Sequence, residues 1–241
     1  MLHQTSGIIL HTTNYSDTSL IVKVYTAKFG LQSYMINGTR SKKSKTKASL
    51  FQPMSIVEIV VSNSEKTSLQ RISEINIQFP YSDIPYNIIK SSIAIFLNEI
   101  LFRSLKEEHS DEDLFLYIKN SLLILDLKTD SCSNFHLCFL IQLSRFLGFY
   151  PQGNFSEKNS CFDLSDGRYI SHLPSHNNYL KPDIAFLLNE LMNSNFEHIQ
   201  ELKIDNTQRK ILLQSIILFY QFHISSFGEL KSLDVLEQVI S

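Results

Sequence analysis

The feature that most constrains the fold is a change in hydrophobic period at Phe79-Pro80. Before this point, short β-branched and aromatic runs alternate with turn residues, which is typical of strands. After it, apolar residues recur every three to four positions, which is typical of helices. The expected strands are Gly7–His11, Thr18–Thr26, Leu31–Asn37, Met54–Val61 and Leu69–Phe79.

This pattern predicts an α+β fold with two domains. Five short strands in residues 1–80 suit an OB-type barrel, which closes its own sheet edges. Residues 81–241 are predicted to form a helical domain, interrupted by an irregular excursion at 151–181 that is rich in Gly, Pro, Asn and Ser. The expected helical segments are 89–101, 114–125, 134–149, 182–192, 206–227 and a short one after 232.

The amino-acid composition excludes several classes of protein. The chain is 43% hydrophobic and has seven glycines and six prolines, which excludes disordered and collagen-like proteins. No apolar run is long enough for a transmembrane helix. The first residues lack the basic start and apolar stretch of a signal peptide, so we expect a cytoplasmic protein. Cys132, Cys138 and Cys161 are too few for a disulfide framework and are expected to be buried thiols.

The net charge of −2 conceals an asymmetry between the two halves. Residues 1–80 hold nine Lys/Arg and four Asp/Glu, whereas residues 81–241 hold thirteen and twenty. A basic half in an otherwise acidic chain indicates a polyanionic partner. Five cations fall within eight positions of the expected loop between the third and fourth strands: Arg40, Lys42, Lys43, Lys45 and Lys47.

This basic loop beside a barrel favours nucleic-acid binding. Lys and Arg neutralise phosphates, and the loop's Ser and Thr hydroxyls can donate to phosphate oxygens. Bases also stack on exposed aromatic rings without sequence preference. We expect Lys23 to contact phosphate, with Tyr15, Tyr25 and Tyr34 as candidate stacking residues or, equally, as barrel core.

Catalytic chemistry has no support in the sequence. It contains no dinucleotide fingerprint, no P-loop, no H-E-x-x-H and no G-x-S-x-G motif, so the chain is not expected to be an enzyme or to need a cofactor. Cys161, Asp163, His172 and His176 lie together in the excursion and could bind a metal in principle, but one cysteine and loose spacing do not favour a metal site.

Several motifs, in order, resemble the RecO family of recombination mediator proteins. The basic half carries most of them, and later motifs extend the resemblance over nearly the whole chain. The matching stretches are His11-x-x-x-Tyr-Ser-Asp-Thr-Ser-Leu20, Tyr25-Thr with Gly30, Gly38-Thr-Arg-Ser-Lys-Lys-Ser44, Leu50-Phe-Gln-Pro53, Asn98-Glu-Ile-Leu-Phe-Arg103, Phe146-Leu-Gly-Phe-x-Pro151 and Leu230-Lys-Ser232.

The resemblance implies an OB-fold domain followed by a helical domain. It also implies binding of single- and double-stranded DNA and annealing of complementary strands. Together with the partner protein RecR, a member of this family is expected to help load RecA onto DNA coated with the single-strand-binding protein SSB. By motif, the family's basic residues correspond to Arg40, Lys42 and Lys43, with Lys45 and Lys47 added for proximity. Many members hold zinc with four cysteines in the excursion, where this chain retains only Cys161, so we expect no metal there and a shape held by packing of Phe162, Tyr169 and Leu173.

An acidic SSB tail would need cations beside an apolar groove. Arg103, Lys106 and Arg145 are candidate cations, with Phe139 and Phe146 as groove walls, although ordinary core aromatics and surface cations explain them as well. Two alternatives to a DNA-binding mediator stay open. One alternative is a protein-interaction scaffold with incidental DNA binding, and the other is an RNA-binding barrel protein.

Overall fold

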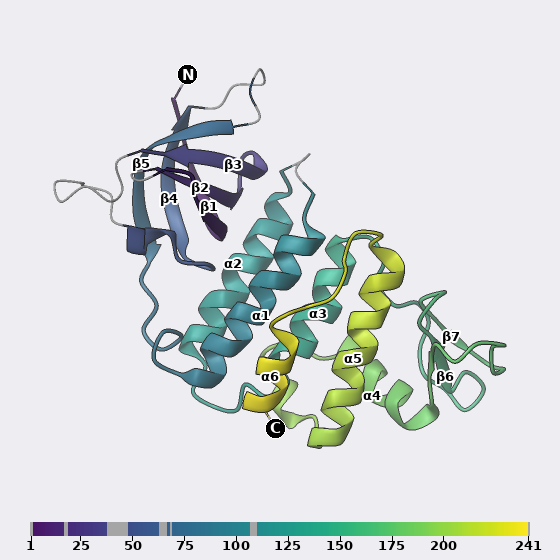
Figure 1. Cartoon of the computed structure of the whole chain (residues 1–241). Coiled ribbons are helices and arrows are strands. Elements are labelled where there is room, and N and C mark those ends of the chain that lie inside the picture. The colour runs from purple at the N-terminus through teal and green to yellow at the C-terminus, as the bar shows by residue number, and fades with distance from the viewer. Residues whose placement is uncertain are drawn as a thin grey trace. The chain divides into compact units, whose positions relative to one another are not determined.

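A computed structural model describes residues 2–16, 19–37, 48–62, 67, 69–106 and 110–240. The strands between residues 2 and 79 form a closed five-stranded barrel in the order β1-β2-β3-β5-β4 (Figure 1). All neighbouring strands are antiparallel except β3 and β5, which are parallel. The predicted α+β fold with an N-terminal OB-type barrel is therefore confirmed. The strands are β1 (Leu2–Asn14), β2 (Leu20–Thr26), β3 (Gly30–Ile36), β4 (Ile56–Ser62) and β5 (Leu69–Phe79).

Alternation along the strands fills the barrel interior. On β2, Leu20, Val22 and Val24 are buried, while Ile21 and Lys23 on the opposite face are half-buried. Successive side chains of a strand point to opposite faces, so this period of two places one set inside. Phe51, from the short 3₁₀ helix η1 (Ala48–Phe51), joins the same core with 2% of its surface exposed.

The chain groups into two compact units. The first contains Met1–Tyr86 and Ala94–Asp126, and the second contains Asn87–Ile93 and Leu127–Ser241. The first unit thus combines the barrel with most of α1 (Ile88–Ser104) and α2 (Glu112–Leu127).

Two polar side chains, the half-buried Asn98 and the buried Asp126, join the barrel and the segment after it to these helices. Asn98 of α1 donates to the Leu10 carbonyl at 3.0 Å, where a β-bulge between Ile9 and His11 interrupts the β1–β2 ladder. The Asp126 carboxylate of α2 accepts hydrogen bonds from the backbone amides of residues 82, 83 and 84 and from the Ser82 hydroxyl, all at 2.8–2.9 Å. Both contacts satisfy backbone groups that no strand or helix ladder pairs.

The second unit contains the remaining helices. Pro182 occupies the first turn of its helix, where its missing N–H costs nothing, as the sequence predicts. Asp205 and Gln208 form a capping box that starts the longest helix. The helices are α3 (Phe135–Phe146), α4 (Pro182–Met192), the 3₁₀ helix η2 (Ile199–Glu201), α5 (Asn206–His223) and α6 (Leu233–Val239).

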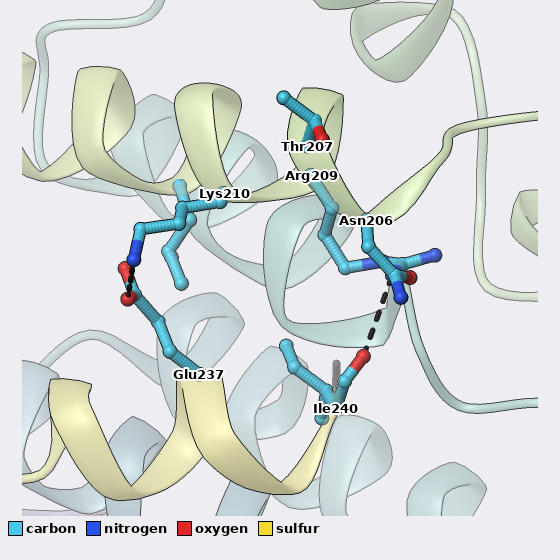
Figure 2. A pocket seen from close by; sticks show the side chains of 7 residues that line it. Asn206, Thr207, Arg209, Lys210, Glu237 and Ile240 are labelled. Carbon is cyan, nitrogen blue, oxygen red and sulfur yellow. Dashed lines mark hydrogen bonds and ion pairs between the residues drawn. The ribbon is translucent and has the colours of Figure 1, made fainter.

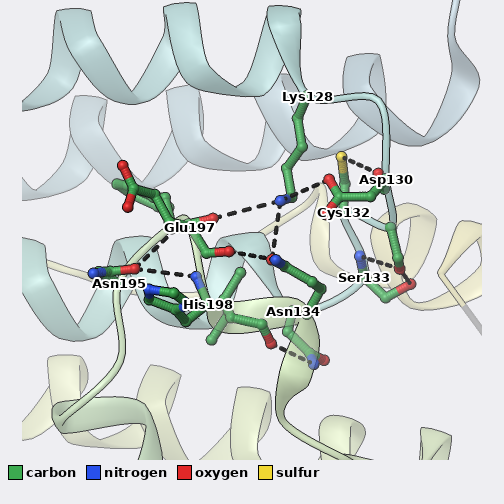
Figure 3. A network of polar contacts seen from close by, with 12 residues as sticks. Lys128, Asp130, Cys132, Ser133, Asn134, Asn195, Glu197 and His198 are labelled. Atoms are coloured by element: carbon green, nitrogen blue, oxygen red, sulfur yellow. Dashed lines mark hydrogen bonds and ion pairs between the residues drawn. The ribbon is translucent and has the colours of Figure 1, made fainter.

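A polar network ties the start of this unit to the segment before α5 (Figure 3). The Lys128 ammonium lies 2.7 Å from the Asp130 carboxylate and donates to the Gln200 side chain at 3.1 Å. The Asn134 amide donates to the Leu202 carbonyl at 3.3 Å, and its oxygen accepts from Arg209 at 3.0 Å. The buried cation of Lys128 is therefore held by oxygens from two separate segments.

The excursion forms a small sheet, β7-β6-β8, from β6 (Cys161–Asp163), β7 (Arg168–Ile170) and β8 (Tyr179–Leu180). Phe162 and Tyr169 pack edge to face at 5.0 Å, and the Tyr169 hydroxyl donates to the Ala185 carbonyl at 2.8 Å. Leu173 is 67% exposed, so the prediction that it packs here is wrong. Polar contacts hold the excursion instead. The buried Asp163 carboxylate accepts hydrogen bonds from the amides of residues 165 and 166 and contacts His176.

In the described part of the chain, no helix is long and apolar enough to cross a membrane.

Candidate nucleic-acid interface

The five cations of the basic loop lie in residues 38–47, outside the described residues. The structure does place the chain on both sides of this segment. Asn37 precedes it and η1 follows it. The two stems show where the segment leaves and rejoins the barrel.

The first stem is attached to the β1–β2 turn. Leu20 pairs with Ile36 in the β2–β3 ladder, and the Ser19 hydroxyl donates to the Asn37 side-chain oxygen at 3.0 Å. Within the turn, the backbone amide of Tyr15 donates to the Ser19 carbonyl at 3.0 Å. Tyr15 and the start of the basic segment therefore lie at the same end of the barrel.

The second stem is attached to β1. The Thr12 hydroxyl donates to the Phe51 carbonyl at 2.8 Å, and the Phe51 ring is buried in the barrel core. Met54 has a positive φ of 65°, a strained conformation for a residue with a side chain. Its amide donates to the Ile9 carbonyl at 2.7 Å and its carbonyl accepts from the Tyr81 hydroxyl at 2.6 Å, so these two bonds hold the strained residue in place.

The three candidate stacking tyrosines separate clearly. Tyr15 is 63% exposed and offers its ring to a ligand. Tyr34 is fully buried in the barrel core, and burial raises the pKa of its hydroxyl to about 12. Its predicted role in DNA binding is therefore wrong, because an enclosed ring has no face for a base. Tyr25 is also buried, packs on Phe115 of α2, and donates to the Asp111 carbonyl at 3.4 Å.

Two of the cations on the described barrel bear on this site. Lys23 is half-buried, with its ammonium 5.6 Å from the centre of the Phe102 ring, a cation–π contact. Arg71 is exposed on β5 and pairs with Met35, two residues before Asn37. Arg71 was not predicted, since only the parallel β3–β5 pairing brings it near Asn37, the last described residue before the basic segment.

The candidate partner-binding residues are divided between the two units. Arg103 and Lys106 belong to the first unit, where Arg103 forms an ion pair of 2.8 Å with Glu99 and Lys106 is exposed. Arg145 belongs to the second unit, where it is exposed and lies 4.4 Å from the Tyr150 ring centre.

The two candidate groove walls differ. Phe139 has no exposed surface, so the prediction that it lines a groove is wrong and the alternative of ordinary core is right for this residue. Phe146 is half-buried, and its role stays a prediction.

The second unit also contains a cleft of about 240 Å³ between α5 and α6. Figure 2 shows Lys210 and Glu237 facing each other across it, at 2.8 Å. Arg209 is buried and, within the part of the chain that the structure describes, donates to the neutral oxygens of Asn134, Asn206, Ile204 and, at 3.4 Å, Ile240. None of the residues singled out in the sequence lines this cleft.

The four candidate metal ligands do not converge. Asp163 and His176 are 3.3 Å apart, but His172 instead contacts the Ser171 hydroxyl. Over the described ranges, no group of three or more His, Cys, Asp or Glu side chains is placed to hold a metal ion. All three cysteines are buried thiols outside any disulfide, as predicted, and burial raises the pKa of the Cys138 thiol to about 12.

Comparison with known proteins covers nearly the whole chain. The model of the recombination protein O N terminal matches residues 1–81, and that of the recombination protein O C terminal matches residues 85–234. The DNA repair protein RecO of Phocaeicola vulgatus is 41% identical over 241 residues, which is 100% of both chains. Those of Bacteroides fragilis and Flavobacterium psychrophilum are 41% and 36% identical, each over 99% of both chains. The chain therefore belongs to the RecO family of DNA repair proteins.

Proposed function

We propose that this chain is a non-enzymatic recombination mediator that acts on DNA through its barrel. It binds single- and double-stranded DNA and anneals complementary strands. Together with RecR, it helps to load RecA onto single-stranded DNA coated with SSB. This work is proposed to take place in the cytoplasm.

One observation carries the DNA-binding proposal. Between Asp17 and Glu58 the chain has seven basic residues and no acidic one, and five of them fall in the segment that joins β3 to η1. Both stems of this segment are fixed to the β1–β2 hairpin, by the Ser19–Asn37 and Thr12–Phe51 hydrogen bonds. A dense set of cations on a firmly attached segment suits sequence-independent contact with phosphates.

The mechanism of annealing follows from charge neutralisation. Two DNA strands repel each other through their phosphates. Cations that cover one strand reduce this repulsion and leave its bases free to pair with a second strand. No bond is made or broken by the protein, so no catalytic group is required.

Protein partners are proposed to bind the helical part of the chain. An SSB tail is acidic and apolar, so it needs cations beside a hydrophobic surface. Arg103, Lys106 and Arg145 are the proposed cations, and Phe146 is the proposed apolar contact. The domain division at residues 80 and 81 stays a proposal, as does the position of the RecR contact.

The test is a triple variant, Arg40→Ala with Lys42→Ala and Lys43→Ala, measured by fluorescence anisotropy with single-stranded DNA. For the unmodified chain, five phosphate contacts predict a slope of log affinity against log salt of roughly −3.5. Removing three of them should make the slope shallower by about 2. The matched control removes three exposed lysines from the second unit: Lys158, Lys181 and Lys203.

The outcomes separate the alternatives. Unchanged affinity and slope in the triple variant at low salt would remove the basic segment from the mechanism. Annealing and tight binding of RecR or an SSB-tail peptide that persist in this variant would favour the interaction scaffold. Preference for RNA over DNA of the same sequence would favour an RNA-binding barrel.

A further inference from the structure

A row of four side chains crosses four neighbouring strands of the barrel. Ile21 of β2 pairs with Thr13 of β1 and with Met35 of β3, and Met35 pairs in turn with Arg71 of β5. Residues that pair directly across neighbouring strands point to the same face of a sheet. Because the strands lie about 4.8 Å apart, the row spans about 14 Å. We call these residues the outer row: Thr13, Ile21, Met35 and Arg71.

Strand parity shows that the outer row points away from the barrel core. Met35 lies between Tyr34 and Ile36, which are both buried in the core. On β5, Arg71 precedes Ile72, which packs against the same core. Successive residues of a strand point to opposite faces, so Met35 and Arg71 both point outward. The two ends of the row are exposed, and its middle is half-buried.

Arg71 places an unpaired cation at one end of the row. In the part of the chain that the structure describes, its guanidinium makes no ion pair and no hydrogen bond. Glu74, the acidic residue of β5, lies three positions further along and pairs with Val60 of β4 rather than with the row. An exposed guanidinium without a partner is open to phosphate oxygens, which it can bind through two parallel hydrogen bonds.

The surface around the row suits an anionic ligand. A second row of paired residues lies beside it on the same four strands and points to the same face: His11, Lys23, Ser33 and Leu69. Neither row contains an acidic residue, whereas Glu58 and Glu74 lie on β4 and further along β5. A surface without carboxylates does not repel phosphates.

The outer row also adjoins the basic segment. Met35 lies two residues before Asn37, the last described residue ahead of that segment. At the other end, Tyr15 follows Thr13 by two residues and is 63% exposed. Within the described residues, the Tyr15 ring contacts no other ring, so its faces are open. The row therefore connects an open aromatic ring to the unpaired cation of Arg71, past the stem of the basic segment.

We propose that the outer row is a path for single-stranded nucleic acid across the barrel, with Arg71 as a phosphate contact. Ile21 and Met35 offer apolar surface to the bases, and Tyr15 offers a ring on which a base stacks. The path selects unpaired strands, because a duplex hides the faces of its bases. This inference rests on the proposed DNA binding of the barrel, and adds to it a contact outside the basic segment.

Arg71→Ala tests the phosphate contact by fluorescence anisotropy with oligo-dT. Each phosphate contact on a single strand contributes about 0.7 to the slope of log affinity against log salt, which is roughly fivefold in affinity at 0.1 M salt. We expect Arg71→Ala to lose that factor and to show a slope shallower by about 0.7, whereas Arg71→Lys keeps the charge and the slope. Arg168→Ala, which removes an exposed arginine from the second unit, is the matched control and should bind as the unmodified chain does.

The absence of tryptophan from the chain makes contact with the bases observable. Met35→Trp introduces a single indole in the middle of the outer row, with no background emission. Its fluorescence should fall when oligo-dT binds, and should stay constant with an abasic deoxyribose-phosphate strand of the same length. Phe186→Trp, at a 46% exposed position of α4, is the control and should respond to neither. Circular dichroism and thermal unfolding check that every variant remains folded.

Each other result overturns the path. Equal affinity and slope for Arg71→Ala and Arg168→Ala would show that Arg71 contacts no phosphate. A silent indole at position 35, or equal quenching by the abasic strand, would show that the bases do not lie on the outer row. Quenching by a protein partner such as RecR, and not by oligo-dT, would assign the surface to that partner. In all of these cases the proposed function stands if the unmodified chain binds oligo-dT, and it fails itself if that chain binds no DNA.

Discussion

The Ser19 hydroxyl and the Asn37 side chain are joined by a hydrogen bond of 3.0 Å across 18 residues of sequence. Ser19 closes the turn that carries the exposed Tyr15, and Asn37 is the last described residue before the basic segment. The bond therefore connects the turn that carries Tyr15 to the last described residue before the basic segment.

Breaking this bond should weaken binding of single strands without unfolding the barrel. Ser19→Ala and Asn37→Ala each remove an exposed hydrogen bond, so the free energy of unfolding should fall by less than about 1 kcal/mol. We expect a three- to fivefold loss of oligo-dT affinity, roughly 0.6–1 kcal/mol, measured by anisotropy. Ser131→Ala, which removes a surface hydroxyl from the second unit, is the control. Affinities equal to that control would show that the turn does not position the segment.

Asp126 should be the most sensitive carboxylate for stability. Asp126→Ala leaves three backbone amides and the Ser82 hydroxyl without their shared acceptor, and should lower the free energy of unfolding by about 3 kcal/mol in urea titrations at pH 7. Asp113→Asn, in the exposed first turn of α2, should change it by less than about 1 kcal/mol.

The pH dependence of this contribution has a definite sign. Burial alone raises the pKa of Asp126, but the amides of Ile84, Ser82 and Asp83 and the Ser82 hydroxyl together hold it below its ordinary value of 3.8. The unfolded state therefore binds the proton more readily, and the stabilisation is present above pH 3.8 and lost as pH falls through the lowered folded-state pKa. The difference in stability between the unmodified chain and Asp126→Ala should shrink in acid. A difference that grows below pH 3.8 would contradict this assignment.

Asn98 should be needed as a hydrogen-bond donor. Asn98→Leu leaves the Leu10 carbonyl at the β-bulge without this partner and should cost about 2 kcal/mol. Asn98→Asp should cost more at pH 7, since a carboxylate faces a carbonyl, and should recover in acid when the carboxyl group can donate. Asn120→Asp, exposed on α2, is the matched control. Thermal unfolding across pH measures both effects, and equal losses at positions 98 and 120 would refute the donor role.

Gly167 should tolerate no side chain. Its φ is +68°, and an added Cβ would lie 3.1 Å from the Phe219 ring. Gly148 also has a positive φ, +84°, but an added Cβ would meet nothing within 4 Å. Both alanine variants therefore bear the backbone cost, about 1 kcal/mol or more, and only Gly167→Ala adds a clash. We expect the larger loss of thermal stability for Gly167→Ala. A similar loss at both positions would show that packing against Phe219 does not restrict this turn.

The excursion should need no metal for its stability. Its described contacts are the Phe162–Tyr169 ring pair, the Tyr169 hydroxyl bond to α4 and the Asp163 hydrogen bonds. Metal-bound folds lose stability when the ion is removed. Dialysis against a strong chelator should therefore leave the thermal midpoint unchanged, and elemental analysis should find no stoichiometric zinc. A fall in the midpoint that added zinc reverses would contradict this prediction.

Much of the fold is visible in local periodicity. The helix at Pro182–Met192 has the predicted bounds, because its starting proline and amphipathic pattern are local signals. The strand expected at Gly7–His11 instead begins at Leu2, where polar residues pair with β4. Pairing with a second strand, which no local pattern reveals, extends β1 beyond its apolar run.

The site was less predictable, for reasons that differ by residue. Tyr34 lies two residues before the buried Ile36 and so on the same face of β3, which was a signal that it points inward. Tyr15 lies beyond the strand end, where parity no longer decides. Arg71, Asn98 and Phe102 contact barrel residues that are distant from them in sequence. No local sequence pattern indicates these contacts.

The Asp126 contacts also bear on how the protein can be divided for study. The amides it holds belong to residues 82–84, the three positions that separate the two family-matched regions. A cut at this junction would strip the barrel of α1 and α2, leaving Leu10 and the 82–84 amides open to solvent. An autonomous N-terminal fragment must therefore run through Asp126, and failure of a shorter one to bind DNA would report misfolding rather than a missing ligand contact.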